Sequence, residues 1–449
     1  MNICVLSASP KGSYSVTYQT VRYLALRFPE DRFETLHIGA RIRAAEKELS
    51  PFTQQLQGAD LILFCYPVYT FMAPYQLHRF IELLKEAGVR LDGKSCAQIT
   101  TSKHFYDTTA HAYVRENAED LGLCYLGGLS ADMDDLLSER GREEAEAFWR
   151  LVHFRKENGL FDAPKAAPVS EIRPYIPLGR KSEKTEAGEI VIVANLEKGD
   201  TELAAMIEDF RDIYPAKSRV VNLVEYPFKG GCLGCFRCAT DGKCVYKDGF
   251  DSFLREEIQS GSAIVYAFRV KDHSMGARMK LYDDRQFCNG HRTVTAGMPM
   301  GYIVAGDIER EENLRTVIAG RSEVGGNFLC GVATDAAGVA ALAKTLSYAL
   351  KEKLTQPANF LGVGGMKIFR DLIYLMQGMM RADHKFYKAH GLYKDFPQKK
   401  KTTILKMKLV GLLISNEKIR RKMGNKMNEG MLMPYNKLFK KLENESKGK

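Results

Sequence analysis

The chain opens with NICVLSASPKGSYSVTYQTVRYLALRF, residues 2–28, and this stretch predicts the fold class. Residues 2–6 are an apolar run of strand formers, residues 7–17 are polar, and an amphipathic segment continues to about Phe28. A strand, a loop and a helix in this order are typical of the opening of an α/β fold with a parallel sheet. We therefore expect a sheet whose first strand is the first segment of the chain.

The polar loop, residues 7–17, is rich in hydroxyl groups at the start of a helix. Free backbone N–H groups and the helix dipole favour an anion at such a position. The loop matches neither G-x-x-x-x-G-K-[ST] nor G-x-G-x-x-G, which weakens a nucleoside triphosphate or classical dinucleotide interpretation. A helix cap followed by a turn explains the same residues, so the loop alone leaves phosphate binding open.

Two further loops follow expected strands near residues 60–65 and 95–100. They read YPVYTFMAP, residues 66–74, and TSKHFYD, residues 101–107. In an open α/β sheet, ligands bind at loops beyond the carboxyl ends of the strands, and an aromatic loop there suits a flat ligand. An apolar cluster under the loop is the alternative. A second strand near residues 33–38, a helix over about 109–121 and a strand near 124–126 complete five β/α units.

The second half of the chain repeats this pattern, from an opening strand at residues 189–194 to a fifth strand at 331–333. Such an internal duplication predicts two tandem doubly wound parallel-sheet domains. The loop equivalent to the first has lost most hydroxyls and gained Glu197 and Asp200, which would repel phosphate. We predict a first domain at residues 1–150, a linker at 151–188, a second domain at 189–354 and a helical basic extension at 355–449.

Four of the ten cysteines lie in GCLGCFRCATDGKC, residues 231–244. Four thiolates in one short loop are the ligand set of a [4Fe–4S] cluster, and the glycines suit its sharp turns. Zinc sites usually present two close pairs separated by a longer arm, which makes zinc the weaker alternative, beside a loop of free thiols. The spacing C-x2-C-x2-C-x5-C predicts these metal ligands: Cys232, Cys235, Cys238 and Cys244.

The first loop, residues 66–69 and residues 100–107 together resemble the three flavin-contacting loops of flavodoxin-like NAD(P)H-dependent FMN reductases. The resemblance covers about residues 1–150 and implies a flavodoxin-like fold, bound FMN and NAD(P)H as a possible co-substrate. In that family the first loop holds the FMN phosphate and the others flank the ring; Val16 stands where the family often has Asn. By position it implies FMN contacts from Ser9, Lys11, Ser15, Thr17, Tyr66, Pro67, Val68, Tyr69, Thr101, Ser102 and Lys103.

The cysteine segment is similar to the cluster loop of iron–sulfur flavoproteins, which carry one [4Fe–4S] cluster and FMN on a single flavodoxin-like subunit. They work as oligomers in which cluster and flavin of different subunits approach. This chain resembles two such subunits fused, each keeping one cofactor. The resemblance implies a homo-oligomer. The four-thiolate cluster loop itself raises the expectation of an anaerobic source.

Charge is concentrated at the end of the chain. Residues 398–449 hold 15 Lys/Arg and 4 Asp/Glu, a net charge of +11, whereas the whole chain carries +10 and the remainder therefore −1. The folded domains are thus not expected to bind nucleic acid. The tail predicts a helical arm packed on the domains or, as the alternative, a membrane-surface or acidic-partner contact. Without a recognisable signal peptide or an apolar run long enough to span a bilayer, a cytoplasmic location is expected.

Together these features predict an FMN- and [4Fe–4S]-dependent oxidoreductase. Its electrons would pass between NAD(P)H, or a ferredoxin-like donor, and a small organic or protein acceptor. The alternatives are a non-catalytic electron carrier or interaction protein and a simple FMN reductase with zinc in the cysteine loop. No general acid is identified, although Tyr69, Lys103 and His104 lie in suitable loops.

Overall fold

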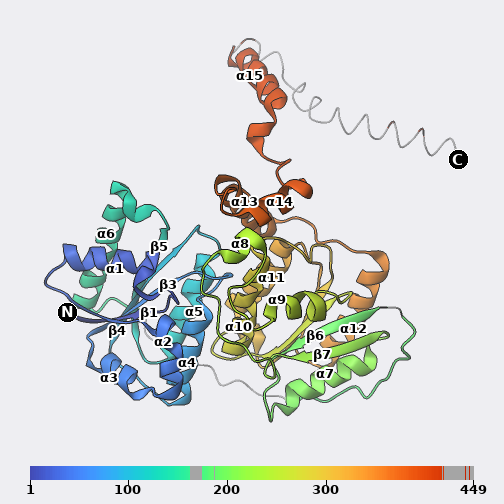
Figure 1. The fold of residues 1–449 in the computed structure, drawn as a ribbon, viewed down its shortest axis with the longest axis horizontal. Coiled ribbons are helices and arrows are strands. Elements are labelled where there is room, and N and C mark those ends of the chain that lie inside the picture. The colour runs from blue at the N-terminus through green and yellow to red at the C-terminus, as the bar shows by residue number, and fades with distance from the viewer. Residues whose placement is uncertain (162–173, 187, 417, 419–439, 441–443, 445–449) are drawn as a thin grey trace. The chain divides into compact units, whose positions relative to one another are not determined.

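The computed structural model describes residues 1–161, 174–186, 188–416, 418, 440 and 444. The chain forms two compact units, Met1–Phe386 and Tyr387–Lys449. The larger unit contains two five-stranded parallel sheets, one in each half of the repeat (Figure 1). Residues 162–173 and 187 of the predicted linker, and most of the tail beyond residue 416, lie outside the described residues.

The first domain is a sheet of order β2-β1-β3-β4-β5 with helices on both faces. Its central strand β3, LILFCYP, is buried along almost its whole length, as expected for a parallel strand covered on two faces. The strands are β1 (Asn2–Ser7), β2 (Arg32–Leu36), β3 (Leu61–Pro67), β4 (Ser95–Ser102) and β5 (Cys124–Asp132). The helices are α1 (Val16–Arg27), α2 (Ile38–Lys47), α3 (Ser50–Gly58), α4 (Tyr75–Glu86), α5 (Asp107–Asp120) and α6 (Glu139–Glu157).

The second domain has the equivalent order, β10-β9-β8-β6-β7. Its strands are β6 (Glu189–Ala194), β7 (Lys217–Asn222), β8 (Ile264–Arg269), β9 (Met300–Ala305) and β10 (Leu329–Ala333). Its helices are α7 (Thr201–Ile213), α8 (Arg237–Asp241), α9 (Phe250–Phe253), α10 (Gly276–Arg285), α11 (Glu312–Gly325) and α12 (Ala336–Glu352). Helices α13 (Phe360–Leu375), α14 (Arg381–Ala389) and α15 (Lys401–Ser415) follow. The predicted fold, two tandem α/β parallel-sheet domains and a helical C-terminal region, is confirmed.

The helices between β2 and β3 were not anticipated from the sequence. Helix α2 has non-helical backbone at Arg41, and Pro51 lies in the first turn of α3. Both helices are short, so neither carries enough turns for its apolar period to be distinctive.

The two domains pack through equivalent helices, α4 and α10. Asp284 of α10 accepts a hydrogen bond from the backbone N–H of Tyr75 at the start of α4, at 2.7 Å. Glu82 of α4 accepts one from the backbone N–H of Ala277 at the start of α10, also at 2.7 Å. Each helix therefore supplies the carboxylate that satisfies the free N–H groups at the other helix's positive end. Such reciprocal contacts are those of a two-fold related pair.

The turns that precede these helices also match. Tyr69 pairs with Met72 in the first domain and Lys271 with Ser274 in the second. The two residues inside each turn have positive φ, 50° and 76° in the first and 52° and 58° in the second. Side chains from the inner layers of both domains join one apolar cluster, from Phe64 and Phe80 to Met279 and Val324. The duplicated halves thus form an internal pseudo-dimer with a shared core.

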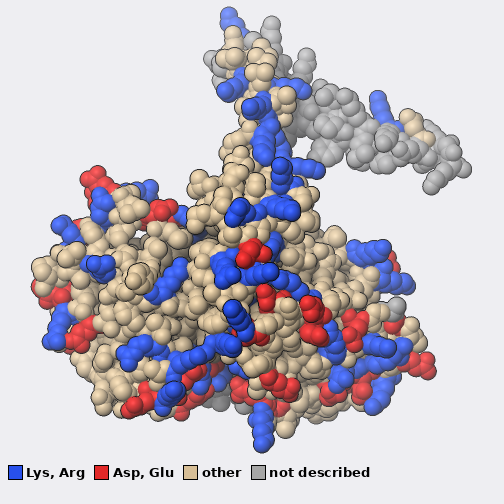
Figure 2. Space-filling model, in the orientation of Figure 1, with Lys and Arg blue, Asp and Glu red and all other residues tan. Residues whose placement is uncertain are grey.

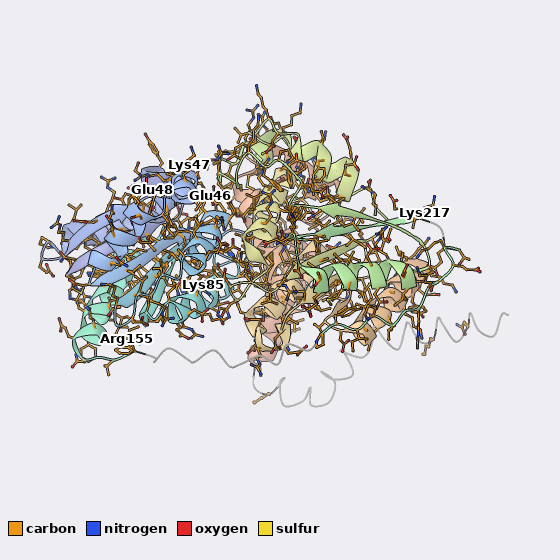
Figure 3. The ribbon with its side chains drawn as sticks, turned by 90° about the horizontal axis from the view of Figure 1, so that it is seen from below. Glu46, Lys47, Glu48, Lys85, Arg155 and Lys217 are labelled. Atoms are coloured by element: carbon orange, nitrogen blue, oxygen red, sulfur yellow. The ribbon has the colours of Figure 1, made fainter. Side chains whose placement is uncertain are left out.

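His273 contributes a charged contact to this interface. Its ring nitrogens lie 3.0 Å from Asp120 and 3.1 Å from Glu311. Lys85 reaches Asp120 at 2.5 Å and Asp272 at 3.2 Å, from the side of the first domain that faces the second (Figure 3). Burial disfavours the imidazolium, but the two carboxylates raise the pKa of His273 to about 10.

The raised pKa of His273 gives a testable pH dependence. Because the ordinary value is about 6.5, the contact stabilises the fold fully below about pH 6.5 and is lost as pH rises through about 10. We expect His273→Gln to lower the free energy of unfolding by about 2 kcal/mol near pH 6. Urea unfolding should show this gap closing near pH 10.5, roughly half a unit above the folded pKa. An equal gap at both pH values would contradict the assignment.

The smaller unit is described from Tyr387 to residue 416 and at residues 418, 440 and 444. Its α15 exposes Leu405, Leu409 and Leu412, and Lys side chains lie along it (Figure 2). Over the two sheet domains, Lys/Arg and Asp/Glu are interspersed on the face seen there. None of the helices in the described part of the chain is both long and apolar enough to cross a bilayer.

Candidate functional site

A cavity of about 350 Å³ lies between the carboxyl ends of the first domain's strands and the second domain. All but one of the residues predicted to contact FMN line it. They are Ser9, Lys11, Ser15, Thr17, Pro67, Val68, Tyr69, Thr101, Ser102 and Lys103. The three predicted loops therefore meet at one cavity, as the carboxyl ends of adjacent parallel strands must.

Tyr66 is the exception. Its side chain is buried, and its hydroxyl donates to Gln98 Oε1 at 2.6 Å rather than lining the cavity. Successive side chains of a strand point to opposite faces, and Tyr66 in β3 points to the inner face, with Phe64. The difference from the sequence prediction follows from this alternation.

The first loop fits an anion. Helix α1 begins at Val16 after Ser15, whose side chain makes no capping hydrogen bond, so the first N–H groups of α1 are not satisfied by a cap. The hydroxyls of Thr17 and Thr101 lie 2.6 Å apart and are buried, which ties this loop to the third one. Lys11 lines the same cavity. A cation, hydroxyls and an uncapped helix N-terminus are the groups that hold a phosphate.

The aromatic turn is held from the second domain. Lys280, which is fully buried, donates to the carbonyl oxygen of Tyr69 at 2.9 Å and pairs with Asp284 at 2.5 Å and Asp283 at 3.1 Å. Burial raises the pKa of Asp284 to about 6, against the opposing effect of Lys280. The sequence does not show what these charges hold, because Tyr69 lies 211 positions from Lys280. A buried cation of one domain thus fixes a predicted flavin loop of the other.

Lys103 lies in the third loop, directly after β4, and pairs with Asp132 at 2.6 Å and Asp134 at 3.1 Å. Burial opposes its charge, but these hydrogen bonds raise the pKa of Lys103. His104 does not line the cavity. Its Nδ1 instead lies 2.8 Å from Asp107 Oδ2. Of the three candidate acids, Tyr69 and Lys103 line the cavity and His104 does not.

The four predicted cysteine ligands line a second, smaller cavity of about 30 Å³. Cys232 and Cys238 line the large cavity as well. The loop turns through positive φ at Gly234, Phe236 and Gly242. A fifth cysteine, Cys288, also lines the small cavity. It lies outside the cysteine loop in the sequence, so its position gave no sign of this contact.

Burial governs the chemistry of the cysteine loop. It raises the pKa of Cys238 to about 11 and raises that of Cys232 further, so the thiolates need a compensating positive charge. Arg285, which is 1% exposed, lies 3.7 Å from Cys244 Sγ and pairs with Asp248 at 2.7 Å. Four thiols around one small cavity beside a buried guanidinium fit an anionic metal centre better than free thiols.

The cysteine loop touches the predicted flavin loops. A Cβ placed on Gly234 would lie 2.0 Å from the Tyr69 hydroxyl. The ammonium of Lys11 lies 5.4 Å from the centre of the Phe236 ring. The two predicted cofactor sites, on different halves of the repeat, therefore adjoin.

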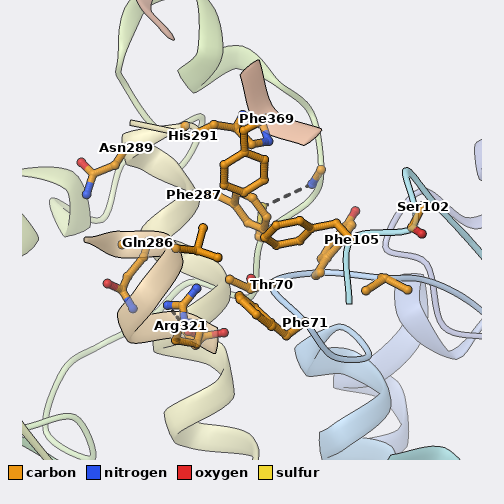
Figure 4. Close-up of a pocket in the computed structure, with 18 of the residues that line it drawn as sticks. Thr70, Phe71, Ser102, Phe105, Gln286, Phe287, Asn289, His291, Arg321 and Phe369 are labelled. Carbon is orange, nitrogen blue, oxygen red and sulfur yellow. Dashed lines mark hydrogen bonds and ion pairs between the residues drawn. The ribbon is translucent and has the colours of Figure 1, made fainter. Parts of the chain in front are cut away.

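Helix α13 completes the wall of the large cavity. Phe369 stacks on Phe105 with ring centres 4.5 Å apart, and Phe105 packs edge-on to Phe71 at 5.0 Å. These rings, together with Phe287, gather around the cavity from both domains and from α13 (Figure 4). Tyr106 donates to the carbonyl oxygen of Leu361 at 2.6 Å. The start of the predicted extension is thus part of the site.

Comparisons with known proteins agree with the fold. Residues 1–127 match a family model described as the flavodoxin-like fold. No curated protein matches the chain. Among solved structures, general stress protein 14 of Treponema denticola in complex with FMN is 13% identical and covers 34% of this chain and 98% of its own, with a TM-score of 0.28.

Two further solved structures are similar at the same level. An FMN-dependent NADH-azoreductase of Bacillus anthracis is 16% identical, covering 34% of this chain and 100% of its own with a TM-score of 0.28. NAD(P)H:quinone oxidoreductase of Methanothermobacter marburgensis is 11% identical, covering 37% and 99% with a TM-score of 0.28. The chain therefore carries a flavodoxin-like fold, matched by sequence over residues 1–127 and repeated with the same strand order in the second domain.

Proposed function

We propose that this chain is a flavin-dependent oxidoreductase with FMN in the first domain and a [4Fe–4S] cluster in the cysteine loop of the second. NAD(P)H or a ferredoxin-like protein supplies electrons, and a small organic or protein molecule accepts them. The observation that carries the proposal is that Cys232 and Cys238 line both cavities, so that the flavin loops and the cysteine loop share a wall. FMN exchanges one or two electrons and a cluster exchanges one, so adjoining sites suit conversion between the two.

This chain's residues have distinct parts in the proposal. Ser9, Ser15, Thr17 and Lys11 would hold the FMN phosphate, and residues 67–69 and 101–103 would flank the ring. Cys232, Cys235, Cys238 and Cys244 would ligate the cluster, with Arg285 offsetting its negative charge. Lys280 holds the Tyr69 carbonyl and so orients the aromatic turn.

Two alternatives are less well supported. The cavity of about 350 Å³ has to hold FMN, but its lining extends beyond the predicted flavin loops to Phe287 and Phe369, and a carrier whose flavin never meets a small substrate gives that part of the lining no role. Tetrahedral zinc places its sulfurs about 3.8 Å apart, from Zn–S bonds of about 2.3 Å. Within the described residues, no three of these thiols belong to a group whose ligand atoms all lie within 4.8 Å of one another. A tetrahedral zinc site is therefore not preformed among the thiols of the described residues.

Anaerobic purification, an absorption spectrum and analysis for iron, sulfide, zinc and flavin test the proposal. We expect Thr17→Glu to lose FMN and keep iron, because like charges in contact cost several kcal/mol, roughly a 100-fold or greater loss of affinity. Ser13→Glu is the control, since Ser13 is exposed in the same loop and does not line the cavity. A protein that contains zinc, or that binds no FMN, would overturn the proposal.

The basic tail provides a separate prediction. Truncation after Pro397 should leave both cofactors bound, since every proposed ligand precedes it. If the tail contacts a membrane surface, the intact chain should bind vesicles of anionic lipid, more weakly as salt increases, and the truncated chain should not. Co-sedimentation measures this. No binding at low salt would remove the membrane role from the proposal.

A further inference from the structure

We propose that His291, oriented by the buried carboxylate of Asp383, is the proton donor to an acceptor bound in the large cavity. The inference rests on the proposed function and extends it by naming a catalytic residue and a positioning residue. Neither residue belongs to the predicted flavin loops or the cysteine loop.

Asp383 holds His291 at two points. Its Oδ2 lies 3.2 Å from His291 Nδ1 and 3.2 Å from the His291 backbone nitrogen. The Asp383 side chain is 0% exposed, and Arg292 Nε lies 3.5 Å from its Oδ1. An ionised carboxylate only accepts, so the hydrogen lies on Nδ1 and the ring plane is fixed. A base whose ring is oriented by a third group is the usual arrangement of a catalytic imidazole.

The backbone at Gly290, next to His291, allows the carboxylate of Asp383 to approach closely. Gly290 has φ +62°, and a Cβ there would lie 2.3 Å from Asp383 Oδ1. Any side chain at residue 290 would therefore displace the carboxylate. The glycine lets helix α14 bring Asp383 against the loop that carries His291.

His291 lines the large cavity among apolar rings. Its ring centre is 4.7 Å from that of Phe369 and 6.1 Å from that of Phe287, both edge-on (Figure 4). Its side chain is 11% exposed. In such a water-poor setting a hydrogen bond from the imidazole to an acceptor oxygen is stronger than in water.

The chemistry balances for a carbonyl acceptor such as a quinone. Reduction to the hydroquinone takes two electrons and two protons. The electrons come from the nicotinamide donor through the flavin site of the proposed function. His291 gives one of the protons as an imidazolium, with hydrogen on both ring nitrogens: the Nε2–H bond breaks as an O–H bond forms on one quinone oxygen, and the neutral ring keeps its hydrogen on Nδ1, facing Asp383. The other proton, and the one that restores His291, come from the donor and from solvent.

Helices α13 and α14, which follow the second domain, contribute residues to this site. Asp383 lies 92 residues beyond His291 in the chain, so sequence spacing could not connect them. With Phe369 on α13 and Asp383 on α14, the C-terminal segment of the larger unit completes the site.

The test uses the full chain and two probes, 1,4-naphthoquinone and ferricyanide. Ferricyanide takes one electron and no proton. We expect His291→Gln and Asp383→Asn to reduce naphthoquinone about 100-fold more slowly in kcat, with ferricyanide reduction unchanged. Calorimetric titration of the oxidised protein, without donor, should give a naphthoquinone Kd about tenfold weaker for His291→Phe and nearly unchanged for His291→Gln, which still donates a hydrogen bond.

His153→Gln is the matched control. His153 also pairs with a fully buried carboxylate, Asp31, at 2.7 Å, but does not line the cavity. It should leave both rates and the naphthoquinone Kd unchanged. Wild-type naphthoquinone rates in His291→Gln, or a parallel fall with ferricyanide, would overturn the inference, as would no naphthoquinone binding by the wild type. Failure of the proposed function would show instead as loss of ferricyanide reduction in every variant, including the wild type.

Discussion

Cys235→Ser should remove the iron and sulfide of the protein and leave FMN in place. A cluster held by four thiolates loses a ligand at this position, and a serine oxygen is a poor substitute for a soft sulfur ligand. The flavin loops belong to the first domain, and Cys235 lines only the smaller cavity. Because Cys235 is exposed, the change creates no hole in the core. Iron should fall from about four atoms per chain to near zero, with flavin unchanged.

Cys288→Ser is the matched control for this prediction. Cys288 lines the same small cavity, is 2% exposed and is not part of the C-x2-C-x2-C-x5-C spacing. It should keep full iron, with a modest loss of thermal stability from burying a hydroxyl. Full iron and sulfide in Cys235→Ser would show that the cluster assignment is wrong. Loss of iron in Cys288→Ser, with iron kept in Cys235→Ser, would show that Cys288 and not Cys235 is the fourth ligand.

The fold was predictable because its signals are local and repeated. Residues 2–28 carry a strand, a loop and a helix, and residues 189–210 carry them again. Buried strands such as β3 read as continuous apolar runs, and their order follows from the fold class. The loops after β1, β3 and β4 could be placed at one site for the same reason, since parallel strands end at one edge.

The remainder of the site depends on contacts between distant parts of the chain. Lys280 reaches Tyr69 across 211 positions, and Asp383 reaches His291 across 92. Asp284 accepts a hydrogen bond at the N-terminus of α4, and Glu82 accepts one at the N-terminus of α10. Both contacts form only because the two halves are related by an approximate two-fold axis. No local period encodes such pairings. Tyr66 shows the converse: Pro67, Val68 and Tyr69 after it line the cavity, but strand alternation turns the Tyr66 side chain inward.

The pseudo-dimer also bears on how the two proposed cofactors communicate. The sequence resemblance of the cysteine segment implies oligomers in which flavin and cluster of different subunits approach one another. Here one chain supplies both halves, and Gly234 of the cysteine loop meets the Tyr69 hydroxyl. The halves have diverged in opposite ways, since one kept hydroxyls in its first loop and the other gained Glu197 and Asp200. Halves that exchange electrons can lose one cofactor each without losing the path between them.

Electron exchange between the two centres should therefore occur within one chain. In rapid mixing of the anaerobic protein with a reductant, the second centre should follow the first at a rate independent of protein concentration. Gly234→Ala should slow this step several-fold, because a Cβ there would lie 2.0 Å from the Tyr69 hydroxyl and force the loops apart. Gly234→Ala combined with Tyr69→Phe removes that oxygen and should recover part of the rate.

Gly242→Ala is the control that distinguishes contact between the cysteine loop and Tyr69 from backbone strain within the cysteine loop. Gly234 has φ +59° and Gly242 has φ +75°, so alanine is strained at either position. The three atoms nearest to a Cβ at Gly242 all belong to the guanidinium of Arg292, the closest at 3.2 Å, and none belongs to a flavin loop. Gly242→Ala should therefore leave the exchange rate unchanged in any protein that keeps its iron. If the second centre were reduced at a rate proportional to protein concentration, exchange would be between molecules and the pseudo-dimer would not be the electron path. If both glycine variants slowed it equally, strain in the cysteine loop, and not contact with Tyr69, would control the rate.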